Sequence, residues 1–258
     1  MSPPDSSPLD IALAEGRRFI DAQASRSVAP TGTRADMLAA LPSELPARGL
    51  DPSEVVRTIA RAAEPGLMGN LSGRFFAWVK GGALPAAHAT DVLATLWDQN
   101  VVLAATSPAG AVLEEVAGRL LLEALHLPET CAYSFTTGCQ MSHATALAAA
   151  RHHVLARAGW DVEGDGLFGA PPICVLANQH RHSSVDRALR LLGIGTAAIV
   201  PMSGGGAGKV GARELEAALA ATQGAPTIVI LNAGDLNLGA SDDFATLAPI
   251  AQAAGAWV

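Results

Sequence analysis

Short apolar runs alternate with helical stretches from about residue 132 to the end of the chain, and this rhythm constrains the fold more than any other feature. Most of the runs are rich in Val, Ile and Leu and are bounded by Gly, Pro or Asn, which is typical of buried strands. We expect strands at 132–136, 173–177, 197–201 and 227–231, and helices at about 139–158, 184–192, 212–221 and 244–253. The order of these elements predicts an α/β fold in which helices cover both faces of a mostly parallel sheet.

The residues before this series are helical. Apolar residues recur at helical spacing in four stretches, at about 9–24, 52–63, 85–105 and 109–125. We expect residues 1–66 to form an N-terminal helical segment that packs on the main domain or on a second subunit, and residues 67–258 to form the main domain. Residues 255–258 have the character of the first part of another buried strand, so we expect the sequence to be truncated.

Composition excludes several classes of protein. Of the 258 residues, 50% are apolar and only 16% are charged, so the chain can bury a full-sized core. The net charge of −7, without a cluster of Lys and Arg, argues against a nucleic-acid partner. No leader of basic and then apolar residues is present, and no apolar run reaches the roughly 18 residues of a membrane span. We therefore expect a cytoplasmic protein with no membrane partner.

The first loop with chemical potential is the run Thr136-Thr-Gly-Cys-Gln-Met-Ser142, which follows an expected strand and opens a long helix. Free backbone N–H groups and the positive end of the helix dipole can hold a phosphate there, and Gly138 lets the backbone approach it closely. An ordinary strand-to-helix turn explains the same residues. On the local sequence alone, the ordinary turn is favoured.

The second loop, residues 178–184, places His180 and His182 between a strand and a helix. An imidazole at such a position can stack on a flat ring, transfer a proton or bind a metal. No acidic or Cys cluster completes a metal site, so we expect no metal. A helix cap by Ser183 or Ser184 and a solvated His180 are the plainer alternatives. His182 is the strongest candidate for chemistry.

Two later loops are open to plain explanations. The polar loop 232–239 follows an apolar run and lies close to Asp242 and Asp243, which helix capping alone can explain. The run 206–211 formally matches GxGxxG, but a dinucleotide fingerprint belongs at the first strand-to-helix turn of its unit. We interpret that run as a flexible connection.

Taken together, the loops resemble the pyridoxal-phosphate-dependent decarboxylase family, which includes aromatic-amino-acid and glutamate decarboxylases. The resemblance covers about Gly69 to Val258, and its order and spacing are more specific than any single block. The blocks that carry it are Gly73-Arg-Phe-Phe-Ala-Trp-Val-Lys-Gly-Gly82, Thr136-Thr-Gly-Cys-Gln-Met-Ser-His143, His182-Ser-Ser184, and Gly234 to Gly239 with Asp242. The resemblance implies the aspartate-aminotransferase-like large domain, also called PLP fold type I.

The resemblance also implies roles for single residues around pyridoxal phosphate. The backbone of Gly138, Cys139 and Gln140 is expected to hold the cofactor phosphate. His182 is expected to stack on the pyridine ring, to help position the substrate and to manage protons. Asn237 is the nearest polar candidate in the loop where the family has two threonines.

Substrate and assembly are implied in the same way. Phe76, Trp78 and Gly81 fall where the family lines its substrate pocket, often from the partner subunit. We therefore expect a homodimer with its active site at the subunit interface and an amino acid as the small-molecule substrate. Because Cys139 and Gln140 replace the usual small or hydroxyl residues, the resemblance fixes the cofactor class more firmly than the reaction.

The lysine that forms a Schiff base with the cofactor, and the Asp that pairs with the pyridine nitrogen, would lie beyond Val258. Neither Lys80 nor Lys209 stands in an equivalent block, so this chain alone is expected to be inactive. The leading hypothesis for the whole protein is a carboxy-lyase. A non-catalytic relative that binds or serves a structural role, and a PLP enzyme of another reaction type such as an aminotransferase or another lyase, are the alternatives.

Overall fold

A computed structural model of the chain describes residues 7–202 and 208–258. It divides into two compact units, Met1–Gln99 and Asn100–Val258, and each is described here by itself. The boundary predicted between residues 66 and 67 stays a prediction. Residues 206 and 207 of the run 206–211, which is predicted to be a flexible connection, lie outside the described residues.

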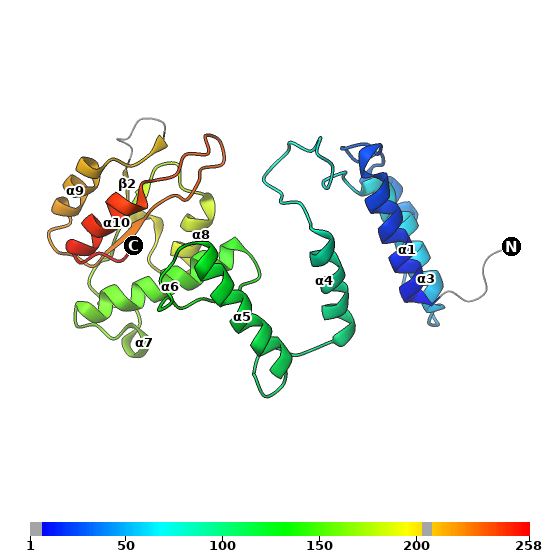
Figure 1. The fold of residues 1–258 in the computed structure, drawn as a ribbon, viewed down its shortest axis with the longest axis horizontal. Coiled ribbons are helices and arrows are strands. Elements are labelled where there is room, and N and C mark those ends of the chain that lie inside the picture. Colours follow the sequence, from blue (N-terminus) through cyan, green and yellow to red (C-terminus); the bar gives the residue numbers. More distant parts are fainter. Residues whose placement is uncertain (1–6, 203–207) are drawn as a thin grey trace. The chain divides into compact units, whose positions relative to one another are not determined.

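The first unit is helical. Its elements are α1 (Pro8–Asp21), the 3-10 turn η1 (Ala22–Ala24), α2 (Arg34–Ala39), α3 (Pro52–Ala63), the 3-10 turn η2 (Glu64–Gly66) and α4 (Pro85–Trp97). Helices α1 and α3 pack against each other (Figure 1). The helix predicted to run to residue 105 ends at Trp97, because Asp98 takes a left-handed conformation with φ of 47° that closes the helix.

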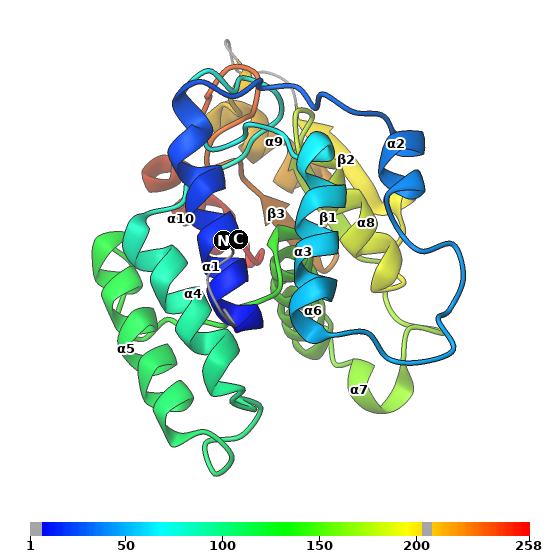
Figure 2. The ribbon, with the colours of Figure 1, turned by 90° about the vertical axis from the view of Figure 1, so that its right-hand side faces the viewer.

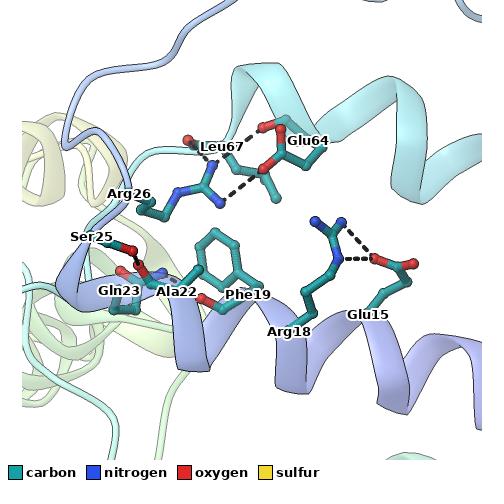
Figure 3. A network of polar contacts seen from close by, with 9 residues as sticks. All are labelled: Glu15, Arg18, Phe19, Ala22, Gln23, Ser25, Arg26, Glu64 and Leu67. Carbon is teal, nitrogen blue, oxygen red and sulfur yellow. Dashed lines mark hydrogen bonds and ion pairs between the residues drawn. The ribbon is translucent and has the colours of Figure 1, made fainter.

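Arg26 holds the end of η2 to the turn that follows α1 (Figure 3). Its guanidinium donates to the Oε1 of Glu64 at 3.0 Å and to the backbone oxygen of Leu67 at 3.1 Å. The same group lies 4.7 Å from the ring centre of Phe19. Because the Arg26 side chain is only 13% exposed, this ion pair is shielded from water and contributes more than a surface pair does.

The second unit contains the sheet. Its elements are α5 (Pro108–Ala124), α6 (Cys139–Arg157), α7 (Val162–Asp165), β1 (Cys174–Asn178), α8 (Ser183–Leu191), the 3-10 turn η3 (Thr196–Ala198), β2 (Ile199–Met202), α9 (Ala212–Ala221), β3 (Thr227–Ile230) and α10 (Phe244–Ala253). All strand pairs are parallel, in the order β2-β1-β3 (Figure 2). Trp257 adds a parallel bridge to Ile228, and the expectation of strand character at residues 255–258 is thereby confirmed.

Helices cover both faces of this sheet (Figure 1). Val175 and Ile228 point to one face and are buried against α6 and α8. Leu176 and Val229, the next residues along each strand, point to the other face and are buried against α9 and α10. The alternation of side chains along a strand therefore divides the core into two apolar layers, as the predicted α/β fold requires.

The strand predicted at 132–136 is absent, which corrects one expectation. This segment has no regular secondary structure and no strand partner among the described residues. Instead, the Tyr133 hydroxyl donates to the backbone oxygen of Glu115 in α5 at 3.3 Å, and its ring lies against Gly118. An apolar run becomes a strand only where a neighbour accepts its backbone hydrogen bonds, and local sequence does not report that neighbour.

Candidate functional site

Helix α6 begins with two backbone donors that have no partner in the described part of the chain. The N–H groups of Met141 and Ser142 both donate to the backbone oxygen of Gly138, at 2.9 and 3.1 Å. No hydrogen bond from the N–H of Cys139 or Gln140 is present among the described residues, and no side chain caps the helix. Free N–H groups at the positive end of a helix dipole attract an anion.

Gly138 keeps the approach to these donors open. Its φ of 150° and ψ of 169° belong to a region that is essentially restricted to glycine. A Cβ built at this position meets no heavy atom within 4 Å. The conformation rather than the available space therefore demands glycine here, and the backbone is left uncovered for a ligand.

His182 caps the start of α8 with its own imidazole. Its backbone is extended, with φ of −68° and ψ of 144°, and its Nδ1 accepts the backbone N–H of Ser184 at 3.2 Å. The alternative in which Ser183 or Ser184 caps this helix was therefore wrong. Because the cap occupies Nδ1, the other ring nitrogen, Nε2, is left for other partners.

The starts of α6 and α8 meet at Ser184. The Nε2 of Gln140 donates to the backbone oxygen of Ser184 at 3.2 Å. The hydroxyl of Ser184 lies 2.8 Å from the Nδ1 of His143 and 2.7 Å from the Nδ1 of His182. The structure therefore brings the predicted phosphate loop and the predicted ring-stacking histidine into one network, while their roles toward the cofactor stay predictions.

His143 belongs to this network and was missed in the sequence. It stands three residues after Gln140, so both side chains lie on one face of α6, and this spacing was the available signal. Burial lowers the pKa of His143, and the charge of His182 lowers it further. The imidazole of His143 is therefore held towards its neutral form.

Asp242 ties two loops to the end of β1 at the carboxyl end of the sheet. Its carboxylate accepts the backbone N–H of Val210 at 2.8 Å, the backbone N–H of Asn232 at 2.7 Å and the Nδ2 of Asn178 at 3.4 Å. Asp243 caps α10, as capping predicted, but Asp242 does not. Helix capping therefore does not explain Asp242. Its side chain is buried and fixes the loops instead.

Asn237 lies in a loop that is organised by Asp235. The carboxylate of Asp235 accepts the backbone N–H groups of Asn237 at 3.2 Å and of Leu238 at 2.7 Å. These two hydrogen bonds, in that order, lower the pKa of Asp235. In the described residues the hydrogen bonds of Asn237 stay within this loop, so the structure does not join it to the Ser184 network. Its predicted role stays a prediction.

The predicted substrate residues Phe76, Trp78 and Gly81 lie in the first unit. The side chains of Phe76 and Trp78 are 90% and 73% exposed. The ammonium of Lys80 lies over the rings of Phe75 and Trp78, at 5.4 and 5.8 Å from their centres. This exposed aromatic turn is compatible with a surface that receives a ligand or another chain, and its part in a substrate pocket stays a prediction.

The conserved domain of the pyridoxal-dependent decarboxylases matches residues 35–258, which is most of the chain. The chain belongs to the pyridoxal-dependent decarboxylase family. Membership confirms the resemblance drawn from the loop blocks, and it confirms pyridoxal phosphate as the cofactor class.

Members of the family and solved structures add detail. The L-2,4-diaminobutyrate decarboxylase of Rhizobium meliloti is 28% identical over 179 residues, which are 68% of this chain and 34% of that protein. The glutamate decarboxylase domain of a Vibrio parahaemolyticus protein superimposes with a TM-score of 0.87 at 17% identity, over 97% of this chain and 55% of that one. Mouse CSAD in its apo form gives 0.86 at 21% identity, over 97% and 53%.

The solved relatives confirm the α/β fold of PLP fold type I. The chain spans about a third of the length of the curated relatives that it matches and about half of the solved chains. Within residues 7–202 and 208–258, no helix is long and apolar enough to cross a membrane. The same residues form no group of three or more His, Cys, Asp and Glu side chains that could hold a metal ion.

Proposed function

We propose that the whole protein is a pyridoxal-phosphate-dependent carboxy-lyase that releases CO2 from an amino acid. The observation that carries the proposal is the meeting of the α6 start and His182 at Ser184, in a chain that belongs to the pyridoxal-dependent decarboxylases. The Rhizobium meliloti relative, which is named for decarboxylating L-2,4-diaminobutyrate, supports an amino acid as the substrate class.

The residues present fit a phosphorylated, flat cofactor. The N–H groups of Cys139 and Gln140 are available donors, and the backbone of Gly138 is uncovered. The Oε1 of Gln140 is buried without a hydrogen-bond partner among the described residues. Most buried polar atoms in folded proteins have such a partner. Since backbone groups make the anion site, the unusual side chains at 139 and 140 do not remove its donors.

In this proposal Gly138, Cys139 and Gln140 hold the phosphate, His182 lies on the pyridine ring, and Asn237 contributes a polar contact. When bound, pyridoxal phosphate supplies an electron-withdrawing ring that accepts the electrons of the broken carboxyl bond. His182 contributes a flat imidazole face and a ring nitrogen, Nε2, that can hold or pass a proton.

We further propose a cytoplasmic homodimer in which residues 1–66 help to join the subunits. Phe76, Trp78 and Gly81 would then line the substrate pocket of the partner subunit. Helix α5 supports an interface, because a stripe of large apolar residues along it is 47–61% exposed. These residues are Val112, Leu113, Leu120 and Leu121. Exposed apolar patches are common at interaction surfaces, and in this proposal the second subunit covers this one. Light scattering is expected to give twice the subunit mass, and a monomer would contradict the dimer.

The activity can be tested with the whole protein, expressed from its gene and supplied with pyridoxal phosphate. Equilibrium dialysis should show bound cofactor. At least one amino acid labelled in its carboxyl carbon should release labelled CO2. If the cofactor binds but no amino acid releases labelled CO2, the proposed carboxy-lyase activity is overturned in favour of another reaction of the same cofactor. Failure to bind the cofactor would overturn the whole proposal.

A further inference from the structure

We propose that His143 is a positioning residue: the backbone N–H of Ser184 holds the ring proton of His182 on Nε2, and His143 strengthens this preference through the hydroxyl of Ser184. The tautomers follow from geometry alone, and only their use in catalysis rests on the proposed function. The inference concerns a side chain from α6 that the family resemblance did not assign to the site.

The backbone N–H proton of Ser184 is the one proton in this network whose position covalent geometry fixes. The backbone N–H of Ser184 points at the Nδ1 of His182, 3.2 Å away. A nitrogen that accepts this N–H carries no proton of its own. A neutral imidazole has one protonated and one unprotonated nitrogen, so the proton of His182 is on Nε2.

The hydroxyl of Ser184 has a single proton to give. It lies 2.7 Å from the Nδ1 of His182, and that nitrogen has no proton to offer in return. Two lone pairs facing each other at this distance would repel, so the hydroxyl donates to His182. The hydroxyl proton is thereby committed to one of its two histidine neighbours.

The same hydroxyl determines where the proton of His143 stands. Its Nδ1 lies 2.8 Å from the same hydroxyl oxygen, which can now only accept. His143 therefore carries a proton on Nδ1 and donates it to Ser184. The result is a directed chain from the Nδ1–H of His143, through the Ser184 hydroxyl, to the Nδ1 of His182. Hydrogen bonds aligned in this way polarise and strengthen one another.

The surroundings of the chain hold it in place. Gln140 donates to the backbone oxygen of Ser184 at 3.2 Å, which fixes this residue from the side of α6. His143 is half-buried, and burial is the main cause that lowers its pKa; a protonated His182 would lower that pKa further. Near neutral pH His143 is therefore a neutral ring with one proton, and that proton is directed to Ser184. In the proposed function, His182 would enter the reaction as a donor at Nε2.

Nuclear magnetic resonance of the purified protein labelled with ¹⁵N in histidine tests the tautomers without cofactor or substrate. Long-range ¹H–¹⁵N correlations distinguish a protonated from an unprotonated ring nitrogen, and single substitutions assign each ring. We expect opposite tautomers, with the proton of His143 on Nδ1 and that of His182 on Nε2. The same tautomer in both rings, or the reverse pair, would overturn the inference.

Two variants test whether His143 contributes to the tautomer preference of His182. His143→Leu removes the donor, so the hydroxyl of Ser184 becomes free to accept from His182. Because one hydrogen bond of ordinary strength shifts an equilibrium by roughly 2- to 10-fold, the ratio of Nε2–H to Nδ1–H in His182 should fall by about that factor. His143→Gln keeps an N–H donor and should restore the ratio. An unchanged ratio in His143→Leu would contradict a positioning role.

Controls keep the outcome decisive. His153, which packs on Trp257 with ring centres 5.0 Å apart, should give the same signals in all variants. If His143→Leu does not fold, Ser184→Ala replaces it, because it removes the hydroxyl but keeps the backbone N–H. Opposite tautomers in a protein that releases no CO2 would leave this inference standing and remove the proposed function, so the two can fail separately.

Discussion

The carboxylate of Asp242 lies 2.8 Å from the backbone nitrogen of Val210, although 32 residues separate them in the chain. Its other oxygen accepts the backbone N–H of Asn232 at 2.7 Å. The buried carboxylate of Asp242 therefore accepts hydrogen bonds from two backbone N–H groups that would otherwise need water as their partner. Asn232 follows β3 and Val210 precedes α9. Both loops lie at the carboxyl end of the parallel sheet, where ligands of such folds bind.

The substitution Asp242→Asn is expected to lower the free energy of unfolding by about 2–3 kcal/mol. An amide presents an NH2 group in place of one oxygen, so one backbone N–H loses its acceptor inside the protein. Asp243→Asn is the matched control, because Asn caps helices about as well as Asp and should cost only a few tenths of a kcal/mol. Urea unfolding followed by circular dichroism measures both. Equal losses in the two variants would contradict the role of Asp242.

The sequence predicted the elements of the second unit well wherever apolar periodicity and burial coincide. The helices at 212–221 and 244–253 begin and end as predicted, and β3 ends one residue earlier than predicted. Each of these elements has an apolar face buried in one of the two core layers, and that face is visible in the sequence. The failed strand at 132–136 depended instead on a hydrogen-bonding neighbour that periodicity does not reveal.

The site was predictable only in part for a similar reason. Motif order pointed to Gly138 and His182, since each stands at a strand-to-helix or loop-to-helix transition. The roles of His143 and Asp242 were missed because their partners come from distant elements, with Ser184 41 residues from His143 and Asn178 64 residues from Asp242. Such contacts depend on how α6 packs on α8 and on how the loops fold over the sheet. A single sequence does not show these tertiary arrangements.

Gly138→Ala is expected to destabilise the protein by roughly 1–3 kcal/mol and to weaken binding of pyridoxal phosphate. The reason is conformational, because the backbone φ of 150° is unfavourable for any residue with a Cβ, although space is available. Gly211→Ala is the matched control, since Gly211 also precedes a helix and has open space, but its φ is −91°. Thermal unfolding and equilibrium dialysis compare the two. A loss of similar size at both positions would show that helix capping, not the special backbone, explains Gly138.

Arg26→Lys is expected to lower the stability of the first unit by about 1–3 kcal/mol. A lysine ammonium cannot reach both Glu64 and the backbone oxygen of Leu67 with the planar fork that arginine offers (Figure 3). Arg18→Lys is the control, because Arg18 is 61% exposed and pairs with Glu15 within one helix, which contributes little. Hydrogen exchange of the α1 and α3 amides reports the local effect. Faster exchange in the Arg18 variant than in the Arg26 variant would contradict the prediction.

The pH dependence of stability should carry a signature of His143. Burial and the charge of His182 lower its pKa in the folded chain from the ordinary value of about 6.5. Between the two pKa values the unfolded chain binds more protons than the folded one, so the free energy of unfolding must fall as the pH drops through this window. Above the ordinary pKa the effect is absent, and below the folded pKa it is complete.

His143→Gln removes the titrating group, so the variant should lose less stability than the parent between pH 7 and pH 5. Urea unfolding at several pH values measures the difference. A difference between His143→Gln and the parent that stays constant with pH would mean that His143 titrates alike in both states, and the proposed neutral imidazole at Ser184 would lose its support.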